Sequence, residues 1–105
     1  MTITADARNE TLAELQLCQA RQFGLMCRTA RARSVLRQAD TFWRRRVCRR
    51  AIKRAERAAY DESCAERIFI RTADRLGLGQ AARVIATDGQ AERAVALARL
   101  RAVDL

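Results

Sequence analysis

The pattern of apolar and polar positions has a helical period along most of the chain, including the stretch from Thr41 to Tyr60. At about 100° per residue, the apolar side chains of this stretch fall on one half of the helical wheel. Asp40 or Thr41 supplies an N-terminal cap, and nothing within the stretch breaks a helix. We therefore expect a central helix that is buried on its apolar half, which consists of Val47, Cys48, Ala51, Ile52, Ala55, Ala58 and Ala59.

The other half of the same stretch is basic. Residues 41–60 contain eight basic side chains and a single acidic one, Glu56. Surface helices usually mix the two signs, so an arc of one sign indicates a negatively charged partner. Phe42 and Tyr60 lie inside this arc and either stack on unpaired bases or pack at the helix ends, whereas Trp43 is expected in the core. The candidate contacts on this helix are Arg45, Arg46, Arg49, Arg50, Lys53, Arg57, Phe42 and Tyr60.

A long helix is predicted before the central one. Residues 1–9 have the composition of a polar arm, and Thr11 and Glu14 have the spacing of a capping box, with Asn9 as an alternative cap. The helix is expected to run to about Gln38, followed by a turn. Its inward half consists of Leu12, Leu15, Cys18, Phe23, Leu25, Met26, Ala30 and Leu36. Candidates to extend the basic patch from this helix are Arg21, Arg28, Arg31 and Arg33.

Shorter helices are predicted after residue 60. The apolar pattern stops at residues 60–63, and Ser63 and Glu66 then have capping-box spacing for a helix that ends at the glycines of residues 77–79. A short helix at 80–86, a turn at 87–89 and a last helix at 90–102 complete the chain. The predicted inward residues of this region are Ala65, Ile68, Phe69, Thr72, Ala73, Leu76, Ala82, Ile85, Ala91, Ala94, Val95 and Ala98. The expected fold is an all-α bundle of four to five helices, forming one domain over residues 1–105.

The composition agrees with a helical fold, since the chain has no proline and only four glycines. The net charge of +9 is concentrated in one third of the sequence. Residues 21–57 contain thirteen basic and two acidic side chains, whereas residues 58–105 contain seven of each. Such clustering indicates a surface patch that binds a polyanion. We see no signal peptide and no apolar run long enough for a membrane span, so a cytoplasmic protein is expected.

Few residues are suited to catalysis. The chain has no histidine, and neither a serine nor a cysteine has an evident activating partner, so we do not expect an enzyme. The four cysteines, Cys18, Cys27, Cys48 and Cys64, form no Cys-x-x-Cys pair. A metal site is therefore not expected, nor is any other cofactor, and the cysteines are predicted to be small buried hydrophobic residues.

The octet Ala73-Asp74-Arg75-Leu76-Gly77-Leu78-Gly79-Gln80 resembles the helix–turn–helix core of bacterial regulators. The resemblance implies that Ala73 packs between two helices, that Gly77 makes the turn, and that Gln80 begins a recognition helix. Arg83, however, stands where that family has a buried aliphatic residue, and the excess basic charge lies upstream. A sequence-specific DNA-binding regulator and an ordinary helical hairpin are both compatible with this octet.

In its size, composition and charge layout, the chain also resembles the small helical subunits of CRISPR-type ribonucleoprotein effector complexes. This resemblance implies a non-enzymatic subunit that binds nucleic-acid backbone largely independently of sequence. The expected partners are RNA or single-stranded DNA, together with other protein subunits and several copies of the chain itself. A helix–turn–helix transcriptional regulator is the alternative function. A helical interaction protein or inhibitor, whose basic surface meets an acidic protein surface or a nucleic-acid-binding site, is a third.

Overall fold

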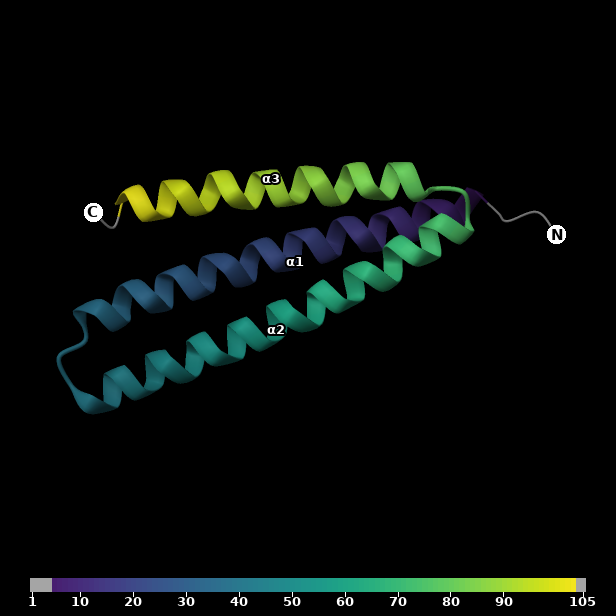
Figure 1. The fold of residues 1–105 in the computed structure, drawn as a ribbon. Helices are drawn as coiled ribbons and strands as arrows, with labels where there is room; N and C mark the ends of the chain where they lie inside the picture. The colour runs from purple at the N-terminus through teal and green to yellow at the C-terminus, as the bar shows by residue number, and fades with distance from the viewer. Residues whose placement is uncertain (1–4, 104–105) are drawn as a thin grey trace.

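Three long helices make up the described part of the protein. The computed structural model describes residues 5–103, and apart from residues 39–41 and 76–78 all of these are helical. The helices are α1 (Ala5–Gln38), α2 (Phe42–Arg75) and α3 (Gly79–Val103). Figure 1 shows α1 lying between α2 and α3, with α2 running back along α1 and α3 then running forward again. The all-α prediction is thus confirmed for the described residues, but the predicted four to five helices are wrong, because there are three.

Helices α1 and α2 face one another along two regular rows of side chains. On α2 the row has the alternating spacing of four and three residues that is typical of coiled coils. Each member of the two rows is buried or partly buried. The row on α1 is Thr11, Leu15, Cys18, Gln22, Leu25, Thr29, Ala32 and Leu36, and the row on α2 is Cys48, Ile52, Ala55, Ala59, Glu62, Glu66, Phe69 and Ala73.

These rows explain why the predicted break at residues 60–63 is wrong. Glu62 and Glu66 occupy inward positions of α2, so the apolar pattern is interrupted there while the helix continues. Glu66 is buried, and the predicted capping box that it shares with Ser63 lies in the middle of α2. In the first helix, Thr11 likewise caps nothing, since its hydroxyl donates to the carbonyl of Ala7 within α1. Residues 5–9 belong to α1 as well, so the predicted polar arm is wrong for them, and residues 1–4 lie outside the described residues.

Helix α3 also continues through its predicted turn at residues 87–89. Gly89 lies where α3 crosses close to α1, because a Cβ atom at this position would lie 2.1 Å from Oε1 of Gln19. The glycine thus permits a close approach between two helices and does not mark a turn. Because the helix is unbroken, the helical period that turns Ala82 inward continues to the end of α3 and determines which later residues face inward. The predicted inward residues Ala91, Ala94, Val95 and Ala98 are exposed, whereas the side chains turned inward are those of Ala82, Ala86, Arg93, Ala96, Leu97 and Leu100.

The connections between the helices have the predicted local chemistry. Thr41 is the N-cap of α2, and its hydroxyl accepts a hydrogen bond from the backbone N–H of Arg44. After α2, Gly77 has a φ of +77°, which suits glycine, and the chain reverses into α3. Near this turn the three helices share a small core of Leu15, Ala73 and Ala82, with Leu12, Phe69, Ile70, Leu78 and Ile85 packed against it.

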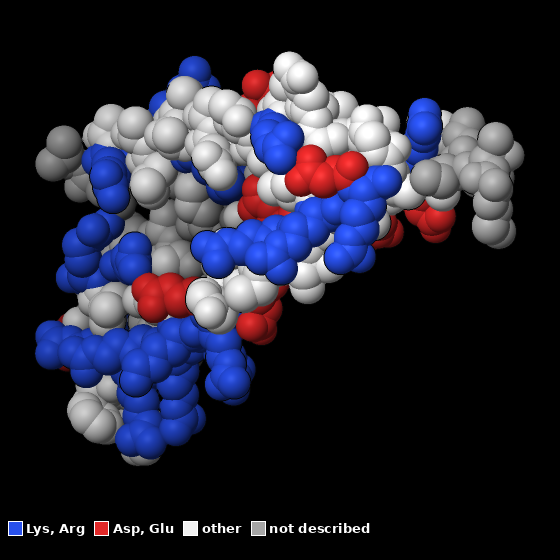
Figure 2. Space-filling view, turned by 45° about the vertical axis from the view of Figure 1, so that its right-hand side comes forward, with Lys and Arg blue, Asp and Glu red and all other residues white. Residues whose placement is uncertain are grey.

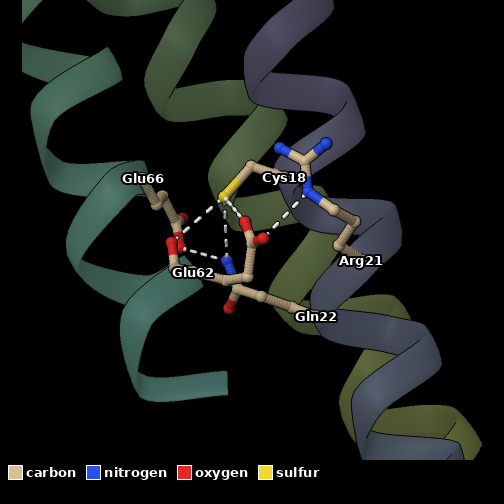
Figure 3. Close-up of polar contacts among 5 residues, drawn as sticks. All are labelled: Cys18, Arg21, Gln22, Glu62 and Glu66. Atoms are coloured by element: carbon tan, nitrogen blue, oxygen red, sulfur yellow. Dashed lines mark hydrogen bonds and ion pairs between the residues drawn. The ribbon is translucent and has the colours of Figure 1, made fainter. Parts of the chain in front are cut away.

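A polar layer follows this core along the bundle, and Figure 3 shows the part of it formed by Cys18, Arg21, Gln22, Glu62 and Glu66. Gln19 donates a hydrogen bond of 2.6 Å to the carboxylate of Glu66, and Gln22 donates one of 2.8 Å to its other oxygen. The amide oxygen of Gln19 accepts a hydrogen bond from Arg93 of α3. Three helices are therefore joined through one buried glutamine, and no buried side-chain nitrogen or oxygen of the described residues lacks a hydrogen-bond partner.

The thiol of Cys18 belongs to the same layer. It lies 3.1 Å from the backbone carbonyl of Glu62 and 3.2 Å from its carboxylate, and it donates to these acceptors. Glu62 in turn forms an ion pair of 2.9 Å with Arg21. Burial, followed by the hydrogen bond to Glu62, raises the pKa of Cys18 from 9.0 to about 11. Cys18 is therefore a neutral thiol that helps hold α1 against α2.

Candidate nucleic-acid interface

The basic arc of α2 lies on the outer side of the helix, opposite the row that packs on α1. Its five residues, Arg46, Arg49, Arg50, Lys53 and Arg57, are all exposed. Within residues 5–103, no acidic side chain forms an ion pair with any of these five. Glu56, the single acidic residue between 41 and 60, is directed to α1, where its carboxylate accepts a hydrogen bond of 2.6 Å from Arg33. The arc is therefore a surface of uncompensated positive charge.

Three further arginines continue this arc beyond the residues predicted from the sequence. Because α2 is unbroken from Phe42 to Arg75, the 100° rotation per residue carries the arc onto Arg67, Arg71 and Arg75, which are all exposed. Extending the periodicity through residue 60 would have found them. We call the eight residues the basic stripe: Arg46, Arg49, Arg50, Lys53, Arg57, Arg67, Arg71 and Arg75. At 1.5 Å per residue, the stripe is about 44 Å long.

The space-filling view shows how basic side chains gather along the molecule. In Figure 2 they form one group at the lower left, where the first turns of α2 lie, and a second group that continues diagonally toward the centre. Tyr60, Asp61 and Cys64 occupy the α2 surface between the two halves of the stripe, and no further acidic residue follows on this side of the helix until Asp74. The stripe therefore has two segments of like charge on one rigid element.

The arginines of α1 are less available than the sequence led us to expect. Arg21 is paired with Glu62, and Arg33 is paired with Glu56 across 2.6 Å, so both join α1 to α2. Arg28 and Arg31 are exposed. Arg45 of α2 is also engaged, since its Nε donates a 3.0 Å hydrogen bond to the carbonyl of Ala39 in the connecting loop. Of these five candidates, the geometry leaves Arg28 and Arg31 with the least structural role.

The aromatic residues of α2 other than Phe69 are exposed. Tyr60 is 70% exposed on the same side as the stripe, and Phe42 is 67% exposed in the first turn. Trp43, which was expected in the core, is 70% exposed, so that prediction is wrong. The reason is its position, because Trp43 lies at the end of the α1–α2 hairpin and its direction on the wheel is closer to Arg46 than to the buried row. Only Ala39 is buried in the adjoining loop.

The octet Ala73–Gln80 forms the connection between α2 and α3. Ala73 is fully buried and Gly77 makes the turn, as the resemblance implied. Helix α3, however, is 25 residues long and returns along the bundle, as Figure 1 shows, whereas helix–turn–helix motifs place their two helices at about 90–120°. Arg83, at the start of α3, forms an ion pair of 3.1 Å with Asp74 of α2. The octet thus has the local turn of the motif in a different arrangement of helices.

The cysteines form no disulfide with one another. Cys18 and Cys48 are buried, Cys27 and Cys64 are partly buried, and all four are free thiols. Among the described residues, no three Cys, Asp or Glu side chains are grouped closely enough to hold a metal ion. None of the three described helices contains an apolar stretch that would cross a lipid bilayer. Comparison with models of protein families, with curated proteins and with solved structures finds no match for this chain.

Proposed function

We propose that this protein binds the backbone of nucleic acids through the basic stripe of α2. The stripe supports this proposal because it presents eight cationic side chains in one row and no acidic partner among the described residues. A polymer with regularly spaced phosphates would contact such a row along its whole length. Binding would release counterions from the polymer and would be largely independent of base sequence.

A long row of predominantly basic side chains fits a nucleic acid better than it fits an acidic protein. Interfaces between proteins usually have an apolar centre with a polar rim. Along the stripe the exposed large hydrophobic side chains are Tyr60 and Ile68, which stand singly among the basic residues and form no continuous apolar centre. Arginine also binds phosphate through two parallel hydrogen bonds, and seven of the eight residues of the stripe are arginines.

Reversal of charge in the first half of the stripe tests the proposal. Arg46→Glu, Arg50→Glu and Arg57→Glu, combined in one variant, should abolish most binding to a labelled oligonucleotide while helicity by circular dichroism stays unchanged. In the wild type, log K should fall with log salt by about 0.7–0.9 per phosphate contact. The matched control reverses Arg8, Arg99 and Arg101, which are exposed on the other helices, and imposes the same change of net charge. Equal losses in the two variants, or an affinity that does not depend on salt, would contradict the proposal.

We further propose that several copies of the chain associate, as expected for a subunit of a ribonucleoprotein. The support is a largely apolar groove of about 660 Å³ between α1 and α3, which is lined by Phe23, Cys27, Ala91, Val95, Ala96 and Leu100 together with Glu92 and Arg99. Val95 is 53% exposed there. The charged side chains in the lining of this groove are one acid and one base, Glu92 and Arg99, so the lining carries no net charge that would repel a second copy.

Sedimentation velocity over a range of protein concentrations tests the association. The wild type should form oligomers, and Val95→Glu should dissociate them by placing a charge in the groove. Val84→Glu is the control, because Val84 is similarly exposed on α3 but lies outside this groove. A wild type that remains monomeric with and without an oligonucleotide would rule out association through this surface.

A further inference from the structure

Phe42 and Trp43 form an aromatic tip at the end of the α1–α2 hairpin. Their ring centroids lie 5.7 Å apart, and the rings meet edge to face at an interplanar angle of 76°. With Val47, which is 64% exposed, they make three large apolar side chains in water within the first two turns of α2. Tryptophan and phenylalanine are usually well buried in folded proteins, so this exposure is unusual.

The fold of the hairpin does not depend on the aromatic tip. Thr41 caps α2, Ala39 is buried in the loop, and the side chain of Arg45 donates to the carbonyl of Ala39. These three residues fix the connection between α1 and α2. The two aromatic rings contact one another and are otherwise available to a ligand.

The tip is continuous with the basic stripe. On the helical wheel, Phe42 and Trp43 lie to either side of Arg46, which follows them by one turn and begins the stripe. Arg44 is also exposed beside them, and its ion pair with Asp40 is long, at 4.0 Å, between two highly exposed side chains. A strand bound along the stripe would therefore pass directly over the rings.

We infer that the aromatic tip stacks on unpaired bases and selects single-stranded nucleic acid over duplex. In a duplex the faces of the bases are stacked on one another, so only their edges and the phosphates are accessible to this surface. A single strand presents base faces that stack on aromatic rings, and such stacking tolerates any base sequence. The combination of exposed rings and an adjoining row of arginines is the usual arrangement for binding single strands. This inference rests on the proposed function, since the stripe must first bring the strand to the tip.

The chain has a single tryptophan, so its fluorescence reports contact at the tip directly. The protein is titrated with an oligothymidylate of about 15 nucleotides, with a duplex of equal length, and with inorganic polyphosphate, which has no bases. The single strand should quench the emission of Trp43, whereas polyphosphate should bind without quenching it. The duplex should bind more weakly than the single strand and leave the emission nearly unchanged.

Substitutions at the tip separate stacking from charge. Phe42→Ala and Trp43→Ala should each lower the affinity for the single strand by about tenfold, while the affinity for polyphosphate and the salt dependence remain those of the wild type. Val47→Ala is the matched control, because it removes a neighbouring exposed apolar side chain that has no ring, and it should change neither affinity. Since all three side chains are exposed, the melting temperature should stay close to that of the wild type and confirm that each variant folds.

Three outcomes would overturn the inference, and they have different meanings. If single strand, duplex and polyphosphate bind equally and Trp43 is not quenched, the tip does not stack, although the stripe binds polyanions as proposed. If none of the three ligands binds, both the inference and the proposed function are wrong. A blue shift of Trp43 with anionic phospholipid vesicles, without quenching by the single strand, would assign the tip to a membrane surface and also overturn the inference.

Discussion

Gln19 of α1 donates a hydrogen bond of 2.6 Å to the carboxylate of Glu66 of α2, and both side chains are buried. Gln22 donates to the other oxygen of the same carboxylate from the next turn of α1. A carboxylate inside a bundle is costly unless such bonds satisfy it. The pair therefore fixes which turns of the two helices face one another.

Removal of this carboxylate should be costly. Glu66→Ala leaves the amides of Gln19 and Gln22 without their acceptor in a buried layer, and we expect a loss of about 2–3 kcal/mol in the free energy of unfolding. Urea denaturation measures this loss. Glu56→Ala is the control, since it breaks an ion pair with Arg33 whose side chains are both about half exposed, and it should cost less than about 1 kcal/mol. Equal losses of unfolding free energy in the two variants would show that the polar layer stabilises the fold no more than an exposed ion pair does.

The contact between α1 and α3 gives a second prediction. Gly89→Ala should destabilise the protein by about 1–2 kcal/mol, because the added methyl group would displace Gln19 from its hydrogen bonds to Glu66 and Arg93. Gly24→Ala is the matched control. Gly24 lies within α1 with no atom near its missing Cβ, so alanine there should stabilise by about 0.5–1 kcal/mol. Thermal or urea unfolding should show that Gly89→Ala lowers the free energy of unfolding and that Gly24→Ala raises it. Stabilisation by both substitutions would contradict the packing of α3 on α1.

The same residues explain how far the sequence predicts the fold. The end of α1 at Gln38, the cap at Thr41 and the turn at Gly77 depend on neighbouring residues, and the sequence identifies all three. The helix breaks predicted near residues 60 and 88 are wrong because the polar and small residues in these regions interact with another helix. The carboxylate of Glu66 accepts a hydrogen bond from Gln19, which is 47 residues away in the sequence, and Gly89 leaves space for the side chain of the same glutamine. Such long-range partners cannot be read from local periodicity.

The same distinction between local sequence patterns and long-range contacts applies to the candidate site. The first half of the basic stripe, from Arg46 to Arg57, was predicted because these residues follow the helical period within one short stretch of sequence. No contact with another helix is needed to place them on one face. Its second half was missed together with the continuity of α2. The exposure of Trp43 was missed for a related reason, since its environment depends on the position of the hairpin end and not on the type of residue.

Because of Cys18, the free energy of unfolding should depend on pH in the alkaline range. In the unfolded chain the thiol loses its proton near pH 9, whereas in the folded protein its pKa is raised to about 11 by burial and by the hydrogen bond to Glu62. Its contribution to stability is therefore complete below about pH 9 and is lost as the pH rises from about 9 to 11, by at most about 1.4 kcal/mol per pH unit. Urea unfolding at several alkaline pH values should show a steeper decline for the wild type than for Cys18→Ala. Cys27→Ala should retain the wild-type decline, and a wild type that declines no faster than Cys18→Ala would contradict the raised pKa.

The length of the basic stripe provides the last prediction. If the stripe acts as one surface over about 44 Å, Arg67, Arg71 and Arg75 contact phosphates as Arg46, Arg50 and Arg57 do. A variant with Arg67→Glu, Arg71→Glu and Arg75→Glu should then bind an oligonucleotide more weakly than the variant reversed at Arg8, Arg99 and Arg101. Its salt dependence should also be shallower than that of the wild type, by about 0.7–0.9 for each phosphate that the variant no longer neutralises.

Oligonucleotide length distinguishes a continuous stripe from a short one. Long strands can contact both segments of the stripe, so reversal of the second segment should weaken their binding strongly. Strands too short to span α2 engage only one segment, and those that bind over the first segment, near the exposed rings of Phe42 and Trp43, should be much less affected. If the second reversal weakens long and short strands no more than the control does, the interface ends at Tyr60, and the continuity of α2 serves only the packing of its buried row against α1.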